Sequence, residues 1–310
     1  KLLMACLSEI AAVFIRFIDT FFCFFAYAKS PRFFELFFVT IDFHCHSTAS
    51  DGGLSPTDLV KRAHYHGATM MSLTDHDQLA GLDEARQTAD LLGVTFINGV
   101  EISVTWRDLT VHIVGLNFDP KHPELVLGLQ QMANSRQARA IEMGRQLEKV
   151  GIADAYAAAL AHANGRVDLI SRTHFARHLV SLKKSPNVRS VFMDYLVAGK
   201  PGYVEHQWSR LEEAVGWIVR AGGVAVIAHP GRYPHDEVSE QELIDEFIKA
   251  GGQAIEVVTG SHSKKQYRTY AEIAKQYNLL ASCGSDFHAK GESKMEVGKV
   301  PASPAALPAV

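Results

Sequence analysis

Residues Ile41 to Asp51 read Ile-Asp-Phe-His-Cys-His-Ser-Thr-Ala-Ser-Asp, and the rest of the chain is organised around them. The alternating character from Ile41 to His46 is typical of a short strand. Side chains two apart on a strand face the same side, so His44 and His46 project together and Cys45 points away. Two imidazoles at a strand end, with Asp51 in the next loop, indicate half of a metal site. Two buried histidines satisfied by hydrogen bonds would give the same local pattern, so these residues alone leave both interpretations open.

The composition describes one large globular domain or a domain with an insertion. The 310 residues are 47% apolar and 21% charged, which is enough to bury a sizeable core. A net charge of -3 argues against a protein that coats nucleic acid or a membrane surface. The four cysteines share no short spacing, as in proteins of a reducing compartment, so we expect a cytoplasmic location. Fifteen histidines direct attention to metal ligands.

Residues 1–38 differ in composition from the rest of the chain. They hold ten of the 17 phenylalanines. Their apolar run contains Arg16 and Asp19, which disfavours a transmembrane helix, and no clean small-residue cleavage site indicates a secretory signal. We expect this segment to be a non-native or disordered extension, with Val39 as the true start, and we expect no membrane association.

From Val39 onward, strands and helices alternate, which predicts an α/β fold. Expected strands cover 41–46, 68–73, 94–102, a hairpin over 104–118, 224–228, 254–258 and 279–283. Expected helices of this alternating part cover 55–66, 79–92, 211–221, 240–249 and 263–277. Between them lies a stretch without a convincing strand, with helices at 123–150, 152–163, 171–182 and 188–198. We therefore divide the chain into a first α/β part (39–119), a helical insertion that caps the site (120–205), a second α/β part (206–300) and a tail (301–310).

Nine polar residues lie at or just after the predicted strand ends, where α/β folds build their active sites. They are six imidazoles and three carboxylates: His44, His46, Asp51, His76, Glu101, His112, His229, Asp286 and His288. This mixed nitrogen and oxygen set suits Mn²⁺, Zn²⁺ or Fe²⁺. Nine ligands fit two or three ions, with Glu101 and Asp286 as natural bridges, and such ions can hold a hydroxide for attack on a phosphate ester. The alternative, nine scattered structural residues, requires each strand end to carry one by accident.

The insertion contains a cationic helix start, Ser171-Arg172-Thr173-His174-Phe175-Ala176-Arg177. Free backbone N–H groups and guanidinium groups at such a start suit a phosphate. An ordinary capped helix with solvated arginines has the same sequence pattern. Lys200, in the loop that leads back to the second α/β part, either lies near the site or is simply exposed.

Five short segments resemble the signature blocks of the PHP (polymerase and histidinol phosphatase) superfamily: 42–47, 74–77, 99–101, 228–230 and 284–288. The resemblance runs from about Val39 to about Lys290. It implies a distorted (β/α)₇ barrel with a trinuclear metal centre at the C-terminal ends of its strands. It also implies three ligand sets: His44, His46, Glu101 and Asp286; Glu101, His112 and His229; and Asp51, His76 and His288.

The insertion and the loop at Lys200 resemble the subgroup of 3′,5′-nucleoside bisphosphate phosphatases, some of which are also 5′-to-3′ exoribonucleases on short 5′-phosphorylated RNA. The resemblance implies hydrolysis of the 3′-phosphate with Mn²⁺ as the expected metal. The attacking hydroxide would be held on metal by Glu101, Asp286 and His229. The second phosphate would be gripped by Ser171, Arg172 and Lys200, with His174 and Arg177 as helpers. No obligate protein partner is evident from the sequence.

Three other functions fit parts of the pattern. A histidinol-phosphate phosphatase would use the same fold and metals, but the arginines of the insertion would repel its cationic substrate. A proofreading exonuclease tied to a polymerase would need a longer chain than 310 residues. A non-catalytic metal-binding module has no need of the complete ligand set.

Overall fold

The computed structural model describes residues 39–234, 236–303 and 308–310, so the expectations for residues 1–38 lie outside the described residues. In chain order, the described elements are β1 (Ile41–Asp42), α2 (Pro56–Tyr65), β2 (Met70–Leu73), α3 (Leu82–Leu92), β3 (Thr95–Trp106), β4 (Leu109–Leu116), α4 (Pro123–Lys149), α5 (Ala155–His162), η1 (Val167–Leu169), α6 (Arg172–Ser181), α7 (Val188–Val191), η2 (Phe192–Leu196), β5 (Ser209–Arg210), α8 (Leu211–Arg220), β6 (Val224–Ile227), η3 (Pro230–Arg232), α9 (Glu237–Lys249), β7 (Ala254–Thr259), α10 (Lys264–Gln276) and β8 (Leu280–Gly284).

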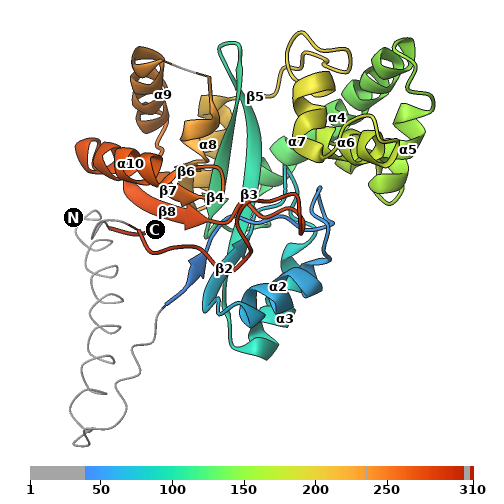
Figure 1. Cartoon of the computed structure of the whole chain (residues 1–310). Helices are drawn as coiled ribbons and strands as arrows, with labels where there is room; N and C mark the ends of the chain where they lie inside the picture. Colours follow the sequence, from blue (N-terminus) through green and yellow to red (C-terminus); the bar gives the residue numbers. More distant parts are fainter. Residues whose placement is uncertain (1–38, 235, 304–307) are drawn as a thin grey trace, which may run out of the picture. The chain divides into compact units, whose positions relative to one another are not determined.

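The sheet has the strand order β1-β2-β3-β4-β6-β7-β8, and β5 pairs with β3 outside this path (Figure 1). β4 runs antiparallel to both of its neighbours, and the other neighbouring pairs are parallel. The segments that follow β1 and β8 also pair with each other. Cys45 and Phe287 form a parallel bridge, and His46 N–H donates to the Phe287 carbonyl at 2.9 Å. This pairing nearly closes the sheet. The predicted distorted barrel with seven strands is therefore confirmed.

The interior of the barrel is apolar at one end and polar at the other. Glu101 on β3 lies directly opposite Val114 on β4, and Val114 pairs in turn with Val226 on β6. Val114, Val226 and Ala254 belong to one buried apolar cluster. His112 lies two residues before Val114 on the same strand, and so it faces the same side. Charged and imidazole groups thus lie above an apolar floor.

The helices of residues 123–196 form a group beside the barrel with a hydrophobic core of their own (Figure 1). Leu147, Phe175 and Leu179 are among its fully buried side chains. The first half of α4 instead packs on the main core, through residues such as Leu125 and Leu129. At 27 residues, α4 is about 40 Å long, so one helix ties this group to the barrel.

Several predicted boundaries were wrong in detail. The regular part of β1 ends at Asp42, and the following residues pair through an isolated bridge. The helix expected over 188–198 is a four-residue α7 followed by the π-helical turn η2. Near the end of the predicted tail, Ala309 forms a bridge with Ala281 on β8. The segment of β1 reaches β8 only from Cys283 onward, where Phe43 N–H donates to the Cys283 carbonyl. The edge of β8 at Ala281 is therefore open to another extended segment.

Across the described part of the chain, no helix combines the length and the apolar character that a membrane crossing requires.

Candidate metal centre

The strand ends bring the nine predicted ligands to one end of the barrel. His44 and His46 follow β1, and His76 follows β2, where its backbone bridges that of Glu101. His112 lies in the first half of β4. Because β4 runs antiparallel to its neighbours, this half lies at the same end of the barrel as the C-terminal ends of the parallel strands. The other members follow in loops or after strands: Asp51 in the loop after β1, His229 after β6, and Asp286 and His288 after β8.

Glu101 is the central group of the cluster. Its Oε1 lies 2.8 Å from His112 Nδ1 and 2.9 Å from His229 Nε2. Its Oε2 lies 3.0 to 3.4 Å from an imidazole nitrogen of three further residues, His44, His46 and His76. Both oxygens of one buried carboxylate therefore face nitrogen ligands, which is the arrangement that a carboxylate needs to bridge two cations.

Two further carboxylates complete the cluster. Asp286 Oδ1 lies 3.6 Å from His46 Nε2 and 3.6 Å from His288 Nδ1. Asp51 Oδ1 lies 3.6 Å from His288 Nε2 and 3.9 Å from His76 Nε2. Ligand atoms within 4.8 Å of one another form four overlapping groups: His46, Asp51, His76 and His288; His44, His46 and Asp286; His44, Glu101 and His229; and His76, Glu101 and His112. The first two resemble the predicted sets, whereas His112 and His229 fall in separate groups that share Glu101.

The donor set fits cations. Within the described residues, eight buried side-chain atoms of the cluster have no hydrogen-bond partner: His44 Nε2, His46 Nδ1 and Nε2, Asp51 Oδ1, His76 Nδ1, Glu101 Oε2, His229 Nδ1 and Asp286 Oδ1. Each buried polar atom without a partner costs about 1–3 kcal/mol of stability. Divalent ions would give partners to the atoms that face one another.

The electrostatics favour the ligand form of His229, His288 and Glu101. Burial, and then the Arg232 charge, lower the pKa of His229 to about 3. Burial, and then His46, lower the pKa of His288 to about 4, so both rings are neutral at physiological pH, as metal ligands must be. Burial opposes ionisation of Glu101, but the surrounding imidazoles outweigh it and hold its pKa well below the usual range. Burial opposes a charge on His44 and His46, but the surrounding carboxylates outweigh it and raise the pKa of both rings, to about 10 for His46. These two rings must therefore release a proton when they bind a metal.

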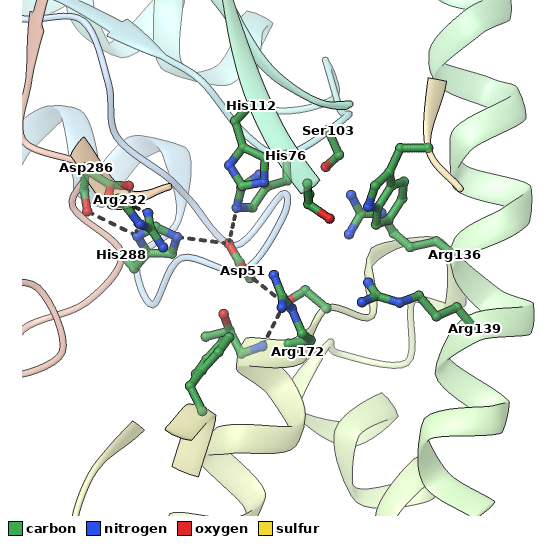
Figure 2. A pocket seen from close by; sticks show the side chains of 15 residues that line it. Asp51, His76, Ser103, His112, Arg136, Arg139, Arg172, Arg232, Asp286 and His288 are labelled. Carbon is green, nitrogen blue, oxygen red and sulfur yellow. Dashed lines mark hydrogen bonds and ion pairs between the residues drawn. The ribbon is translucent and has the colours of Figure 1, made fainter. Parts of the chain in front are cut away.

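A pocket lies directly beside this cluster, between the barrel and the insertion (Figure 2). Its lining includes Asp51, His76, His112, Asp286 and His288 from the cluster. Four arginines line it as well: Arg136 and Arg139 from α4, Arg172 from the start of α6, and Arg232 from η3. In Figure 2, Arg136, Arg139 and Arg172 lie across the pocket from the imidazoles. One wall is cationic and the opposite wall carries the candidate metal ligands.

Two of the four guanidinium groups have no carboxylate partner among the described residues. Arg136 pairs with Asp77, and Arg232 Nη1 donates to Asp286 Oδ2 at 3.1 Å. Arg139 donates only to the Val204 backbone carbonyl at 3.2 Å, and Arg172 lies over the Phe192 ring at 5.5 Å. Burial, followed by the Arg172 and Arg136 charges, lowers the pKa of Arg139 to about 9. Unpaired, partly buried cations in a pocket are the physical requirement for an anion site.

The predicted phosphate-binding residues are placed differently from one another. Ser171 and Arg172 line the pocket, and Ser171 Oγ donates to Asp51 Oδ2 at 2.9 Å. His174 is buried in the helix cap, where its Nδ1 accepts from Ser171 N–H at 3.0 Å. Arg177 is bound to Glu292 through two contacts of 3.0 and 2.8 Å, and Lys200 is exposed. Neither Arg177 nor Lys200 is among the residues that line the pocket.

Four site residues were not identified from the sequence. Arg136 and Arg139 are three apart on a helix and share a face, but solvated helical arginines have the same spacing. Arg232 follows His229 by three residues, and no local pattern distinguishes it. Glu256 was visible as a carboxylate inside an apolar strand, which is the one signal that could have marked it.

Asp77 holds the insertion to the barrel. Its carboxylate pairs with Arg136 and accepts from Ser103 N–H at 2.7 Å and from Ser103 Oγ at 3.0 Å. We expect Asp77→Asn to lower the free energy of unfolding by about 3–5 kcal/mol, because it leaves the Arg136 guanidinium buried without a counter-charge. Urea unfolding followed by circular dichroism measures this loss. The double variant with Arg136→Met should recover much of it, and simple additivity of the two single losses would refute the coupling.

Comparison with known proteins shows the family and agrees with the fold. Residues 42–279 match the sequence profile of the PHP domain. The chain is 50% identical over 258 residues to the 3′,5′-nucleoside bisphosphate phosphatase of Chromobacterium violaceum, covering 83% of this chain and 90% of that protein. It is 45% identical over 247 residues to a 5′-3′ exoribonuclease of Haemophilus influenzae, covering 80% and 89%.

Solved structures give the same result. An amidohydrolase from Chromobacterium violaceum, determined with bound sulfate and no metal, superposes with a TM-score of 0.85 at 48% identity, covering 87% of this chain and 94% of that one. A protein from Bifidobacterium adolescentis assigned as a metal-dependent phosphoesterase superposes with a TM-score of 0.78 at 27% identity, covering 86% and 93%.

A barrel with imidazole and carboxylate clusters at its strand ends indicates a class of enzymes that work with divalent metal ions. The chain belongs to the PHP domain family, and it is a hydrolase that acts as a metal-dependent phosphoesterase.

Proposed function

We propose that the enzyme removes the 3′-phosphate from 3′,5′-nucleoside bisphosphates and also acts on short 5′-phosphorylated RNA. The observation that carries this proposal is the pair Arg139 and Arg172, two guanidinium groups without a carboxylate partner among the described residues, in the same pocket as the candidate metal ligands. A monophosphate needs one anion site at the metal centre. A substrate with two phosphates also gives these arginines an anion to bind. The names of the two relatives described above support this substrate class.

The metal centre is proposed to hold two to three divalent ions, with Mn²⁺ as the expected metal, on three ligand sets. The first set is His44, His46, Glu101 and Asp286; the second is Glu101, His112 and His229; and the third is Asp51, His76 and His288. Zn²⁺ and Fe²⁺ suit the same nitrogen and oxygen donors. When bound, such ions activate water as a nucleophile and neutralise charge on the phosphoryl oxygens. We retain a cytoplasmic location as a prediction from the cysteine pattern.

The protein's own residues position the substrate. Arg139 and Arg172 would bind the second phosphate with charge-assisted hydrogen bonds. They would thereby hold the scissile phosphate at the candidate metal ligands. Ser171 links the two parts of the site, because its Oγ contacts Asp51, a candidate metal ligand, at the beginning of the helix that carries Arg172. Binding of the second phosphate by Lys200, with His174 and Arg177 as helpers, stays a prediction, although these three residues lie outside the pocket lining.

Phosphate release tests the proposal. We expect rapid turnover of 3′,5′-adenosine bisphosphate with Mn²⁺, slow turnover of AMP and histidinol phosphate, complete loss with EDTA and recovery on adding Mn²⁺. The nucleotide product should be 5′-AMP. A parallel assay compares short RNA with a 5′-phosphate and with a 5′-hydroxyl. If histidinol phosphate is the best substrate, the metal centre stands and the substrate proposal is wrong. Equal turnover of AMP and the bisphosphate would refute the proposal that Arg139 and Arg172 bind the second phosphate.

A further inference from the structure

Glu256 is a buried carboxylate that contacts two candidate ligands without facing the pocket. It lies on β7, its residue exposure is 1%, and it does not line the pocket. Its Oε1 lies 2.7 Å from His44 Nδ1. Its Oε2 accepts from the backbone N–H of His229 at 2.5 Å. One side chain of β7 therefore joins residues that follow β1 and β6.

The contact with His44 determines which nitrogen of that ring can bind a metal. A carboxylate oxygen accepts, so the proton of His44 lies on Nδ1. The other nitrogen, Nε2, lies 3.4 Å from Glu101 Oε2 and 3.7 Å from Asp286 Oδ1. The contact with Glu256 therefore directs the Nε2 lone pair toward the two proposed bridging carboxylates.

The contact with His229 acts on the backbone. His229 has φ 29° and ψ 55°, in the left-handed region that residues other than glycine adopt at a cost. In this conformation its side chain reaches Glu101 Oε1 through Nε2 at 2.9 Å. The hydrogen bond from His229 N–H to Glu256 helps to offset the strain at this position.

We propose that Glu256 is a positioning residue for the metal centre, which orients His44 through its ring and His229 through its backbone. The proposal rests on the assignment of these two histidines as metal ligands. Glu256 faces two N–H donors at once, and a carboxylate has an acceptor oxygen for each. A glutamine of the same shape has one acceptor oxygen and one NH₂ donor. If its NH₂ faces the backbone of His229, two N–H donors face each other. If its NH₂ faces His44 Nδ1, that nitrogen must accept, so the proton of the ring moves to Nε2 and blocks the ligand atom.

The experiment compares Mn²⁺ binding by calorimetry in the full chain and in three variants. Glu256→Gln should bind Mn²⁺ about 10- to 100-fold more weakly, as is typical when the partner of a ligating histidine is lost. Excess Mn²⁺ should restore phosphatase activity. Glu296→Gln removes a carboxylate that binds Arg62 at 2.8 and 2.7 Å, away from the cluster, and should leave Mn²⁺ affinity unchanged. His44→Ala should lose Mn²⁺ directly.

The outcomes separate this proposal from the proposed function. Unchanged Mn²⁺ binding in His44→Ala would overturn the ligand assignment itself. Weak binding in His44→Ala with normal binding in Glu256→Gln would overturn the positioning role alone. A lower melting temperature of Glu256→Gln in EDTA with normal Mn²⁺ affinity would give Glu256 a structural role and also overturn the proposal. ¹⁵N NMR of the unaltered Zn²⁺-loaded chain needs no variant: a protonated Nδ1 of His44 is expected, and a deprotonated one contradicts the proposal.

Discussion

Glu101→Gln is expected to reduce kcat/KM for 3′,5′-adenosine bisphosphate by more than about a thousandfold, beyond the 10²–10³ typical for loss of one transition-state contact. The reason is that both Glu101 oxygens face imidazole nitrogens: two on one side, from His112 and His229, and three on the other. The amide removes the negative charge and turns one acceptor into a donor. In the proposed arrangement Glu101 is a ligand of two cations. We therefore also expect a lower metal content after dialysis, measured by elemental mass spectrometry.

The matched control is Glu242→Gln. Glu242 is 44% exposed and pairs with Arg107 at 2.6 Å, and such surface pairs contribute little. Its activity and metal content should equal those of the unaltered chain. Circular dichroism checks that Glu101→Gln retains its secondary structure. A Glu101→Gln enzyme with full metal content and more than a tenth of the activity would contradict the bridging role.

Arg139→Ala and Arg172→Ala are each expected to raise the KM for 3′,5′-adenosine bisphosphate by about 10- to 100-fold. Hydrogen bonds to charged groups contribute about 1.5–3 kcal/mol each, and 1.4 kcal/mol corresponds to a factor of ten. Neither residue contacts the metal-ligand cluster in an ion pair within the described structure, so metal content should not change. Turnover of AMP should change little, and the selectivity for the bisphosphate should therefore fall.

Arg145→Ala provides the control on the same helix. Arg145 is 68% exposed and pairs with Glu142, one turn away, so the kinetic constants should remain unchanged. Equal losses on the bisphosphate and on AMP in Arg139→Ala or Arg172→Ala would refute the second-phosphate role. Lys200→Ala tests the remaining prediction for that exposed side chain: a rise in KM would bring Lys200 back into the binding site.

The local sequence was sufficient to predict which neighbouring side chains face the same side. The period of two along a strand places His44 and His46 on one side, and the same spacing recurs at Asp286 and His288. Strand and helix alternation predicted an α/β fold, and the resemblance to the PHP superfamily implied the barrel, because the same alternation also gives open sheets. Boundaries were less predictable. β1 and the end of the chain depend on which strand edge is left unpaired, and that edge is a property of the closed barrel.

The sequence by itself determined the class of fold, the identity of the clustered imidazoles and carboxylates, and the presence of a helical insertion. Only the tertiary structure decided that Glu256 joins His44 to His229 and that Arg136 and Arg139 face the cluster. Spacing along a strand or helix fixes which side chains share a face. It cannot fix which faces meet, because that depends on packing between segments far apart in the chain.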